Sequence, residues 1–300
     1  MKAFVIYTVL VGGYDDVLQP LVVDDRFDYV LFSNDMKEDQ IGVWSVRAIP
    51  NVVENDNKRL SRYPKSHPET MLSSYKASLY IDANIQIRDK WVYDRFVELY
   101  NQNIEYAGIQ LVLTGRDCIY EHSFDMCQVL VEHDYVAIKQ CHLLHELGFP
   151  RHFGLNENNI IFRIHTDKMK AADEEWWNWI LNHSSRDQFS YMYCLWKHHV
   201  DLHYFLPVGE DSRTSAHFKL IDHNDRQDVL RSKVVKRSLI ERLRIKSKSF
   251  ELDKHRKRWA RIYESSFPVL TLHIDGFFTI ISNLPRLARS VINKARNLPY

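Results

Sequence analysis

The 300-residue chain is poor in the residues that mark unusual folds, with nine Gly, nine Pro and four Cys. So little Gly and Pro argues against low-complexity or long disordered segments. The four cysteines contain no Cys-x-x-Cys pair, and their spacing fits neither a zinc site nor a small disulfide framework. A reducing, cytosolic setting is therefore expected.

Long apolar runs are also missing. No stretch reaches the roughly 18 apolar residues that a membrane-spanning helix needs. The apolar start, residues 3–11, is followed by Gly12 and Gly13 without a small-residue cleavage site. This pattern predicts a buried first strand and not a signal peptide.

Several catalytic motifs are absent as well. The chain has no P-loop, no Gly-x-Gly-x-x-Gly, no His-Glu-x-x-His and no Gly-x-Ser-x-Gly sequence. These absences exclude most nucleotide hydrolases, dehydrogenases and esterases.

What the chain does contain is an alternation of strand and helix patterns. Strands are expected at 3–11, 29–32, 43–49, 78–82, 107–112, 159–164, 204–206 and 217–221. Helices are expected within 55–64 and at 91–100, 123–147, 171–182 and 186–198. Such alternation predicts an α/β fold with a mostly parallel sheet flanked by helices.

The charge of the chain is divided unevenly. Residues 1–230 hold 23 Lys and Arg against 34 Asp and Glu, whereas residues 231–300 hold 17 against 5. We therefore expect two domains, 1–228 and a basic, partly amphipathic helical region 229–300. In that region we expect helices over 225–248 and 253–263, an interrupted apolar segment over 267–284 and a short basic helix from 285.

The basic region is predicted to contact a membrane surface or a protein partner, because a basic stretch beside an apolar one suits an anionic leaflet. Packing on the acidic domain and a dimer contact remain alternatives. No nucleic-acid partner is expected, since no recognised motif accompanies the charge.

A carboxylate and an amide directly follow the predicted strand 78–82. In open α/β sheets, ligands bind at the carboxyl ends of strands. Because residues two apart in an extended chain point to one side, Asp82 and Asn84 would offer two oxygens to a divalent cation bound to phosphates. Such a cation neutralises a pyrophosphate leaving group. A turn between two strands explains the same residues without a metal.

Two further groups of polar residues are candidates for binding a ligand. Thr8, Gly12, Gly13, Ser33 and Asn34 fall at strand ends. Lys58, Arg59, Arg62 and Lys65 form a basic cluster, in which all but Arg59 would share a helix face. Basic groups suit a nucleotide diphosphate, although a solvated helix face is the alternative.

Glu157 and Asp187 are the candidate catalytic carboxylates. Glu157 precedes a strand and could hold a sugar or an acceptor hydroxyl, or belong to an ordinary loop. Asp187 is in the first turn of an expected helix, where it could face a sugar or only stabilise the helix dipole. His223, and less so His217, is the candidate third metal ligand, with a structural histidine as the alternative.

Seven stretches together resemble the bacterial polysaccharide-type glycosyltransferase family, formerly a domain of unknown function, which has plant cell-wall relatives. They are IYTVLVGGYDD, YVLFSND, NKRLSRYPKSHPE, SLYIDANIQI, RDCIYEH, GLNENNIIFR and SRDQFSYMYCLWK. The resemblance covers roughly residues 3–225 and leaves out the basic C-terminal region.

The resemblance implies a GT-A-like fold, a nucleotide-sugar donor and a divalent metal, Mn²⁺ or Mg²⁺. Asp82, Ala83 and Asn84 would take the position of the family's Asp-x-Asp motif, with Asn as a departure that could weaken or rearrange metal binding. Arg186, Asp187 and Gln188 would lie by the sugar. The other donor-binding residues implied are Thr8, Val9, Gly12, Ser33, Asn34, Lys58, Arg59 and Arg62.

We therefore expect a metal-dependent hexosyltransferase. It would move a hexose-type sugar from the donor to a glycan or lipid-linked acceptor, in capsule or other surface polysaccharide biosynthesis. It would act in the cytoplasm, at the inner face of the membrane. The alternatives are a nucleotidyltransferase that uses the same metal, and a non-catalytic module that binds nucleotide sugars or glycans.

Overall fold

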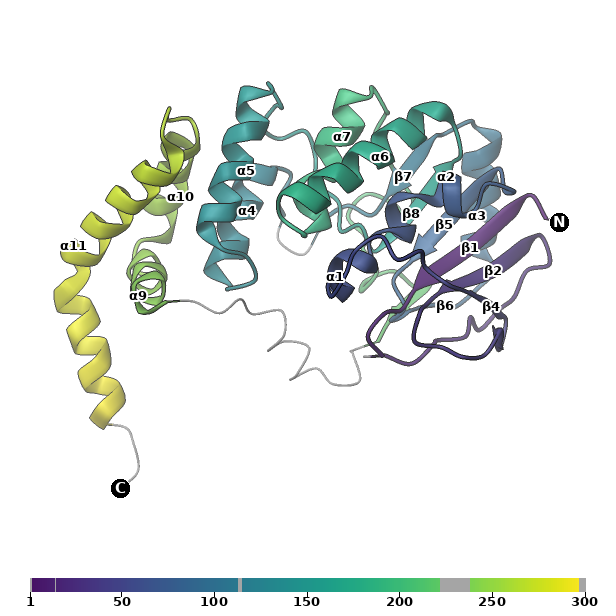
Figure 1. Cartoon of the computed structure of the whole chain (residues 1–300), viewed down its shortest axis with the longest axis horizontal. Helices are drawn as coiled ribbons and strands as arrows, with labels where there is room; N and C mark the ends of the chain where they lie inside the picture. Colours follow the sequence, from purple (N-terminus) through teal and green to yellow (C-terminus); the bar gives the residue numbers. More distant parts are fainter. Residues whose placement is uncertain (1, 14, 113–114, 222–237, 297–300) are drawn as a thin grey trace. The chain divides into compact units, whose positions relative to one another are not determined.

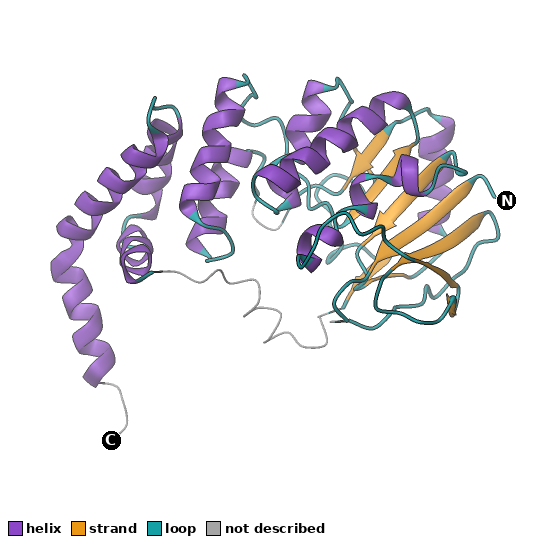
Figure 2. Cartoon of the chain, in the orientation of Figure 1, coloured by secondary structure: helices purple, strands orange, loops and turns teal. Residues whose placement is uncertain are grey.

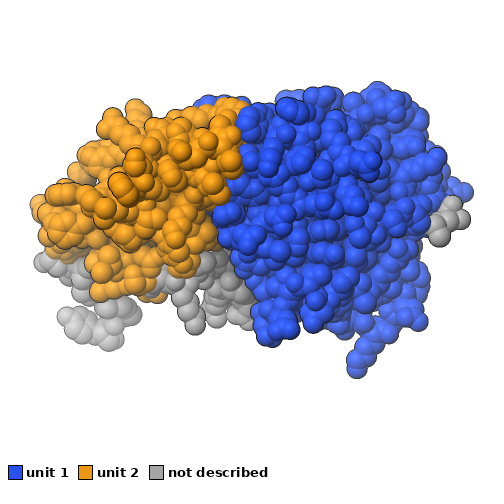
Figure 3. Space-filling view, turned by 45° about the horizontal axis from the view of Figure 1, so that its top comes forward, with its two compact units in different colours: residues 1–117, 152–230 blue, residues 118–151, 231–300 orange. Residues whose placement is uncertain are grey.

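The computed structural model describes residues 2–13, 15–112, 115–221 and 238–296. The chain divides into two compact units, residues 1–117 with 152–230 and residues 118–151 with 231–300 (Figure 3). All of the described strands belong to the first unit, and the described part of the second unit is helical (Figure 2). Residues 118–151 thus group with the C-terminal residues, whereas the sequence analysis had assigned them to the domain 1–228.

The first unit contains an eight-stranded sheet and a separate pair of strands (Figure 1). The strands are β1 Phe4–Val9, β2 Phe27–Phe32, β3 Gln40–Ile41, β4 Trp44–Arg47, β5 Ala77–Ile81, β6 Ile85–Ile87, β7 Tyr106–Gly108, β8 Ile160–Ile164, β9 His203–Tyr204 and β10 Phe218–Leu220. The order in the sheet is β3-β4-β2-β1-β5-β8-β7-β9, and β6 pairs with β10.

The sheet is mixed but mostly parallel, as predicted. Strand β1 runs parallel to β2 and β5, β2 runs parallel to β4, and β7 runs parallel to β9. Strand β8 runs antiparallel to both β5 and β7, and β3 runs antiparallel to β4. Together with the helices that flank the sheet, this confirms the predicted α/β fold.

Alternate side chains of the central strands enter two different layers. The helices of this unit are α1 Asn57–Leu60, η1 Pro64–Ser66, α2 Pro68–Met71, α3 Trp91–Asn101, α6 Asp167–Asn182, η2 Asp187–Phe189 and α7 Tyr191–Lys197. Ile6 and Leu79 pack in one apolar core with Phe96 of α3. On the other face, Arg163 of β8 contacts the backbone of η1 and lies near Trp176 of α6. Because successive residues of a strand point to opposite sides, each central strand is buried on both faces.

The antiparallel course of β8 determines which loops meet at the edge of the sheet. Ile81, the last residue of β5, pairs with Ile160, the first residue of β8. The backbone N–H of Asp82 then donates to the carbonyl of Asn159 at 2.8 Å. The loop before β8 therefore lies beside the carboxyl end of β5.

The second unit is built from two distant segments of the chain. Its helices are α4 Ile119–Gln128, α5 Asp134–Glu146, α9 Leu239–Lys248, α10 Leu252–Tyr263 and α11 Pro268–Arg296. The rings of Phe124 and Trp259 lie 5.5 Å apart, and Tyr120 and Tyr263 stack at 4.7 Å between centroids. Helices α4 and α10 therefore share one core although more than a hundred residues separate them.

The last helix differs from the sequence-based expectation. An interrupted apolar segment over 267–284 and a separate short helix from residue 285 were expected, but α11 is one helix of 29 residues with Pro285 inside it. Proline removes one backbone hydrogen bond without ending this helix. The helix predicted over 225–248 is confirmed for α9, and its first part lies outside the described residues.

Candidate functional site

A buried lysine joins two carboxylates at the carboxyl edge of the sheet. The ammonium of Lys65 donates to Oδ2 of Asp187 at 2.6 Å and lies 3.8 Å from Oδ1 of Asp82. The hydroxyl of Tyr80 donates to the same oxygen of Asp82 at 2.6 Å. The ammonium also lies 4.7 Å from the centroid of the Tyr80 ring, a favourable cation–π distance. We call Lys65, Tyr80, Asp82 and Asp187 the strand-end cluster.

Two features fix the backbone around Lys65: the start of η1 at Pro64 and a hydrogen bond from Arg163. Helix η1 begins at Pro64, whose fixed φ suits the first helical position. The carbonyl of Lys65 accepts a 2.7 Å hydrogen bond from Arg163, which is fully buried and pairs with Asp173 at 2.9 Å. A lysine supported in this way is pre-organised, and only 3% of its side chain is exposed.

Asp187 is fixed through both its backbone and its carboxylate. Its carbonyl accepts a hydrogen bond from the indole of Trp176 at 3.1 Å, and Nε of Arg62 lies 3.8 Å from Oδ2. Burial raises the pKa of Asp187, but the charges of Lys65 and Arg62 outweigh burial and hold that pKa well below its usual range. Asp187 is therefore ionised at neutral pH.

The sequence Asp82-Ala83-Asn84 forms a turn and not an extended chain. The N–H of Ile85 donates to the carbonyl of Asp82 at 2.9 Å, and the chain reverses into β6. The amide nitrogen of Asn84 donates to the carbonyl of Ile221 at 2.9 Å. The prediction of same-side spacing was therefore wrong, because β6 must turn back to pair with β10, and the alternative of a turn is correct. A metal-binding role of Asp82 and Asn84 stays a prediction.

Of the two histidines predicted as a third metal ligand, the structure describes only His217. His217 lies at the far end of β10 from Asn84, where its Nδ1 shares a 2.9 Å hydrogen bond with Asp89 and its ring stacks on Trp91 at 4.1 Å. The register of β10 with β6 thus separates His217 from Asn84, and a metal-binding role of His217 stays a prediction. His223 lies outside the described residues, and the nearest described residue, Ile221, is hydrogen-bonded to Asn84.

Glu157 lies in the loop that the antiparallel β8 brings to the same edge. Its carboxylate accepts hydrogen bonds from Arg213 at 2.6 Å and from Asn159 at 2.9 Å. Its carbonyl accepts one from the side chain of Gln188 at 3.2 Å. Burial raises the pKa of Glu157 above its ordinary value, although Arg213 acts in the opposite direction. The pKa values of Glu157 and Asp187 are thus moved in opposite directions.

Some buried polar atoms at this edge have no hydrogen-bond partner among the described residues. They are the hydroxyl of Thr8, both amide atoms of Asn158 and the amide oxygen of Asn159. Thr8 and Asp82 also line one small pocket, together with Trp44 and Ala83. Buried polar groups are normally paired, so these atoms are places where a ligand or water would bind.

Several residues predicted to bind the donor have structural partners instead. Both amide atoms of Asn34 bond the backbone of Ile49, at 2.7 and 3.1 Å, and tie the end of β2 to the chain after β4. Arg59 pairs with Asp56 at 2.7 Å and donates to the carbonyl of Ile180. These contacts give Asn34 and Arg59 a structural role, and their part in donor binding stays a prediction.

The remaining candidates hold their own loops together. The N–H of Gly12 donates to the carboxylate of Asp35, whose N–H donates to the hydroxyl of Ser33 at 3.2 Å. Val9 is buried in the core. The guanidinium of Arg186 donates to the side chain of Gln188 at 3.0 Å. These residues shape the edge of the sheet around the strand-end cluster.

The basic cluster is only partly brought together. Helix α1 ends at Leu60 and η1 begins at Pro64, so the predicted common helix face of Lys58, Arg62 and Lys65 was wrong. Lys58 is exposed, whereas Arg62 and Lys65 both approach Asp187. The sequence indicates Lys65 only as a member of the basic cluster, and no sequence signal indicates Tyr80.

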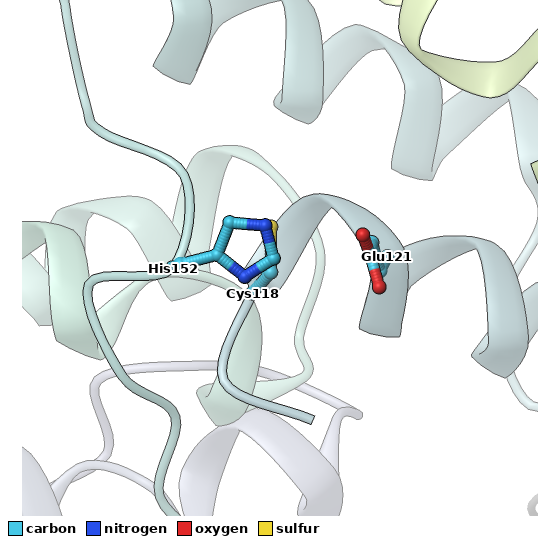
Figure 4. Close-up of side chains that lie close together, drawn as sticks. All are labelled: Cys118, Glu121 and His152. Carbon is cyan, nitrogen blue, oxygen red and sulfur yellow. The ribbon is translucent and has the colours of Figure 1, made fainter. Parts of the chain in front are cut away.

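Two other features do not support a site. A hollow of about 450 Å³ between α6 and α7 contains Glu175, which is already paired with Lys197 and His198 at 2.7 Å each. Figure 4 draws Cys118, Glu121 and His152, whose ligand atoms lie within 4.8 Å of one another. Because His152 belongs to the first unit and the other two to the second, we assign no metal site to them.

Comparison of the chain with protein-family models finds no match, and comparison with curated proteins finds none either. The resemblance carried by the seven motifs therefore stays a prediction.

Proposed function

We propose that the first unit is a glycosyltransferase that uses a nucleotide-sugar donor, as the resemblance predicts. The observation that carries the proposal is the strand-end cluster, in which a buried Lys65 links Asp82 and Asp187 at 3.8 and 2.6 Å. It lies at the carboxyl ends of parallel strands, the edge at which open α/β sheets bind nucleotides.

The donor set at this edge fits a divalent metal that is completed by a substrate. Mg²⁺ is commonly held by one or two carboxylates together with substrate phosphates and water. The side chain of Asp82 is 39% exposed, and the nitrogen of Asn84 is bound to Ile221, which leaves the amide oxygen to act as a ligand. In this proposal Asp82 and Asn84 hold the metal, which would supply positive charge to the leaving diphosphate. Arg62, which is more exposed than Lys65, would add a second positive charge beside the leaving diphosphate.

The two buried carboxylates take different roles in the proposal. A carboxylate accepts a proton more readily when its pKa lies nearer to the working pH. The pKa of Glu157 is raised, so Glu157 is the candidate base for an acceptor hydroxyl. The pKa of Asp187 is lowered, so Asp187 would orient the sugar as a fixed acceptor of hydrogen bonds.

The test is calorimetric titration of the full chain with a panel of nucleotide sugars, first with Mn²⁺ and then with a chelator. We expect one donor to bind, more tightly with metal, and to release nucleoside diphosphate when an acceptor is supplied. Asp82→Asn should remove the metal dependence. Asp89→Asn is the matched control, since Asp89 is a part-exposed carboxylate of the same unit that is paired with His217 at the other end of β6.

The donor, the type of reaction and the metal can each be contradicted by a separate result. If no nucleotide sugar binds, the proposed donor is wrong. If a nucleoside triphosphate binds and pyrophosphate is released, the chain is a nucleotidyltransferase. Equal affinity with metal and with chelator removes the metal from the proposal but leaves the donor site intact.

A further inference from the structure

Helix α11 places its apolar side chains on the side that its neighbours leave uncovered. The helix contacts α5, α9 and α10 (Figure 1). The large apolar side chains that are 46% to 71% exposed are Phe267, directly before the helix, and Leu270, Ile274, Phe277, Phe278, Ile281 and Leu284 of the helix itself. At 3.6 residues per turn they form one stripe over roughly a third of the helix surface. We call these seven residues the outer face.

The packed side of the same helix combines two leucines with small and polar residues. Its buried residues are Leu272, Gly276, Thr279, Asn283 and Leu287. Arg244 of α9 crosses so near to Gly276 that an added Cβ would lie 2.3 Å from its Cδ. Arg244 is itself buried and paired with Asp134 of α5 at 2.6 Å. Small, polar and charged groups therefore lie beside the two leucines where α11 packs, while the seven apolar side chains of the outer face are exposed.

This arrangement differs from that of an amphipathic helix that faces water. A water-facing helix turns its apolar stripe toward the core and its polar face outward. Small and polar residues between helices, with apolar residues outside, are found where the surroundings are lipid. None of the helices among the described residues is both long and apolar enough to cross a bilayer.

We propose that the outer face of α11 docks onto the surface of an anionic phospholipid bilayer, with the helix lying in the interface. Charge selects this occupant over a second copy of the chain. Residues 231–300 carry 17 Lys and Arg against 5 Asp and Glu, and both Arg286 and Arg289 on α11 are exposed. Two such segments would repel each other, whereas an anionic leaflet attracts every basic residue near it.

The inference stands apart from the proposed transferase activity. It depends on α11 and on the charge of its segment, and it would hold if the first unit bound no nucleotide sugar. If both proposals hold, a lipid-linked acceptor would meet the first unit at the surface where α11 holds the chain.

The test is co-sedimentation of the full chain with vesicles of phosphatidylcholine alone and with phosphatidylglycerol added. We expect binding to the anionic vesicles that falls as salt is raised. The double variant Phe277→Ser and Phe278→Ser should lower the partition coefficient at least about tenfold, because interfacial binding scales with buried apolar area. The matched control is Leu21→Ser with Val208→Ser, two residues of the first unit that are 63% and 77% exposed. The control should bind as the wild type does.

A second readout, a dye attached to the outer face, reports whether this face enters the bilayer. The four cysteines are buried, so an environment-sensitive dye can be attached to Phe278→Cys in the folded chain. Its fluorescence should rise and shift to shorter wavelength with anionic vesicles, and that of a dye on Val208→Cys should not.

Three results would overturn the inference. The first is no binding of the wild type to anionic vesicles. The second is equal binding by the Phe277 and Phe278 double variant. The third is a concentration-dependent dimer, seen by light scattering, that the double variant loses, because the outer face would then belong to a second copy.

Discussion

Lys65 is the residue on which the geometry of the strand-end cluster depends most directly. It is buried between Asp82 and Asp187, and its removal would leave Asp187 with Arg62, whose Nε lies 3.8 Å from Oδ2. Breaking a buried ion pair from one side is strongly destabilising because it leaves an uncompensated charge.

We therefore expect Lys65→Met to lower the free energy of unfolding by about 3 to 5 kcal/mol, measured by urea denaturation. Lys58→Met is the matched control, since Lys58 is exposed in the same basic cluster, and it should change stability by less than about 0.5 kcal/mol. The double variant Lys65→Met with Asp187→Leu should recover part of the loss. Equal effects of the two single variants would show that the pair does not support the fold.

The ionised state of Asp187 has a consequence at acid pH. Its pKa is lower in the folded chain than its ordinary value of 3.8, so its contribution is fully present above that value and is lost as pH falls through and below it. Asp187→Asn should therefore flatten the fall in unfolding free energy between about pH 5 and pH 3. The measurement is urea denaturation at several pH values.

The pKa of Glu157 is shifted in the opposite direction to that of Asp187, so its effect on stability at acid pH has the opposite sign. Its pKa is raised on folding, so it binds a proton more tightly in the folded chain and favours folding as pH falls. Glu157→Gln should therefore steepen the acid loss that Asp187→Asn flattens. If both variants changed the slope in the same direction, at least one of the two assigned pKa directions would be wrong.

At the scale of elements, strands that are apolar throughout were predictable and their partners were not. The run over residues 3–11 predicts β1 because both of its faces are buried. The antiparallel course of β8 depends on contacts between segments about eighty residues apart, which periodicity does not contain. For this reason Glu157 was found as a candidate, but its position beside the end of β5 was not.

The strand-end cluster shows the same limit. The sequence indicated that Asp82 ends a strand, but the turn at Asn84 follows from the pairing of β6 with β10, which is a long-range contact. The contact of Lys65 with Asp187 is likewise long-range, and the carbonyl of Lys65 is held by the buried Arg163. Neither relation leaves a periodic signal in the chain.

The contact of α9 with α11 gives a prediction at this scale. Alanine normally favours a helix over glycine by about 1 kcal/mol. At Gly276, however, the added methyl would meet the middle of the Arg244 side chain, whose far end is held by Asp134. We expect Gly276→Ala to lower the midpoint of thermal unfolding, because overpacking costs about 1 to 3 kcal/mol.

Ser282→Ala is the control for Gly276→Ala. Ser282 lies in the same helix and is exposed, so the substitution should leave the midpoint unchanged or raise it slightly. Unfolding of the Gly276→Ala chain at a higher temperature than the wild type would mean that α9 does not pass as close to α11 as the structure has it.

At the scale of the whole molecule, residues 118–151 form an insertion in the first unit. The two residues that flank it are in contact, since Asp117 and His152 share a hydrogen bond of 2.7 Å and the N–H of Gly154 donates to the carbonyl of Asp117 at 2.9 Å. The inserted helices α4 and α5 pack on α10, and α5 also packs on α11. Removing residues 231–300 alone would therefore uncover an apolar core.

We expect a chain that ends at residue 230 to aggregate or to unfold at lower temperature than the full chain. A chain in which residues 118–151 are also replaced by a short Gly-Ser link should be soluble and should unfold in one transition. Size-exclusion chromatography and calorimetry distinguish the two. If the singly truncated chain is as soluble and stable as the doubly truncated one, α4 and α5 do not need their C-terminal partners.

Because the second unit is built from two distant segments of the chain, its helices leave the ribosome at different times. Helix α5 ends at Glu146 and α9 begins at Leu239, so α4 and α5 emerge long before the helices that cover them. At 5 to 20 residues per second the delay is about 5 to 20 s, which is long on the timescale of hydrophobic collapse. During this time β8 must pair with β5 across an unfinished helical insertion. A nascent chain that stops before Leu239 therefore presents Phe124 and Tyr120 without Trp259 and Tyr263, and offers chaperones an apolar surface that the finished protein does not have.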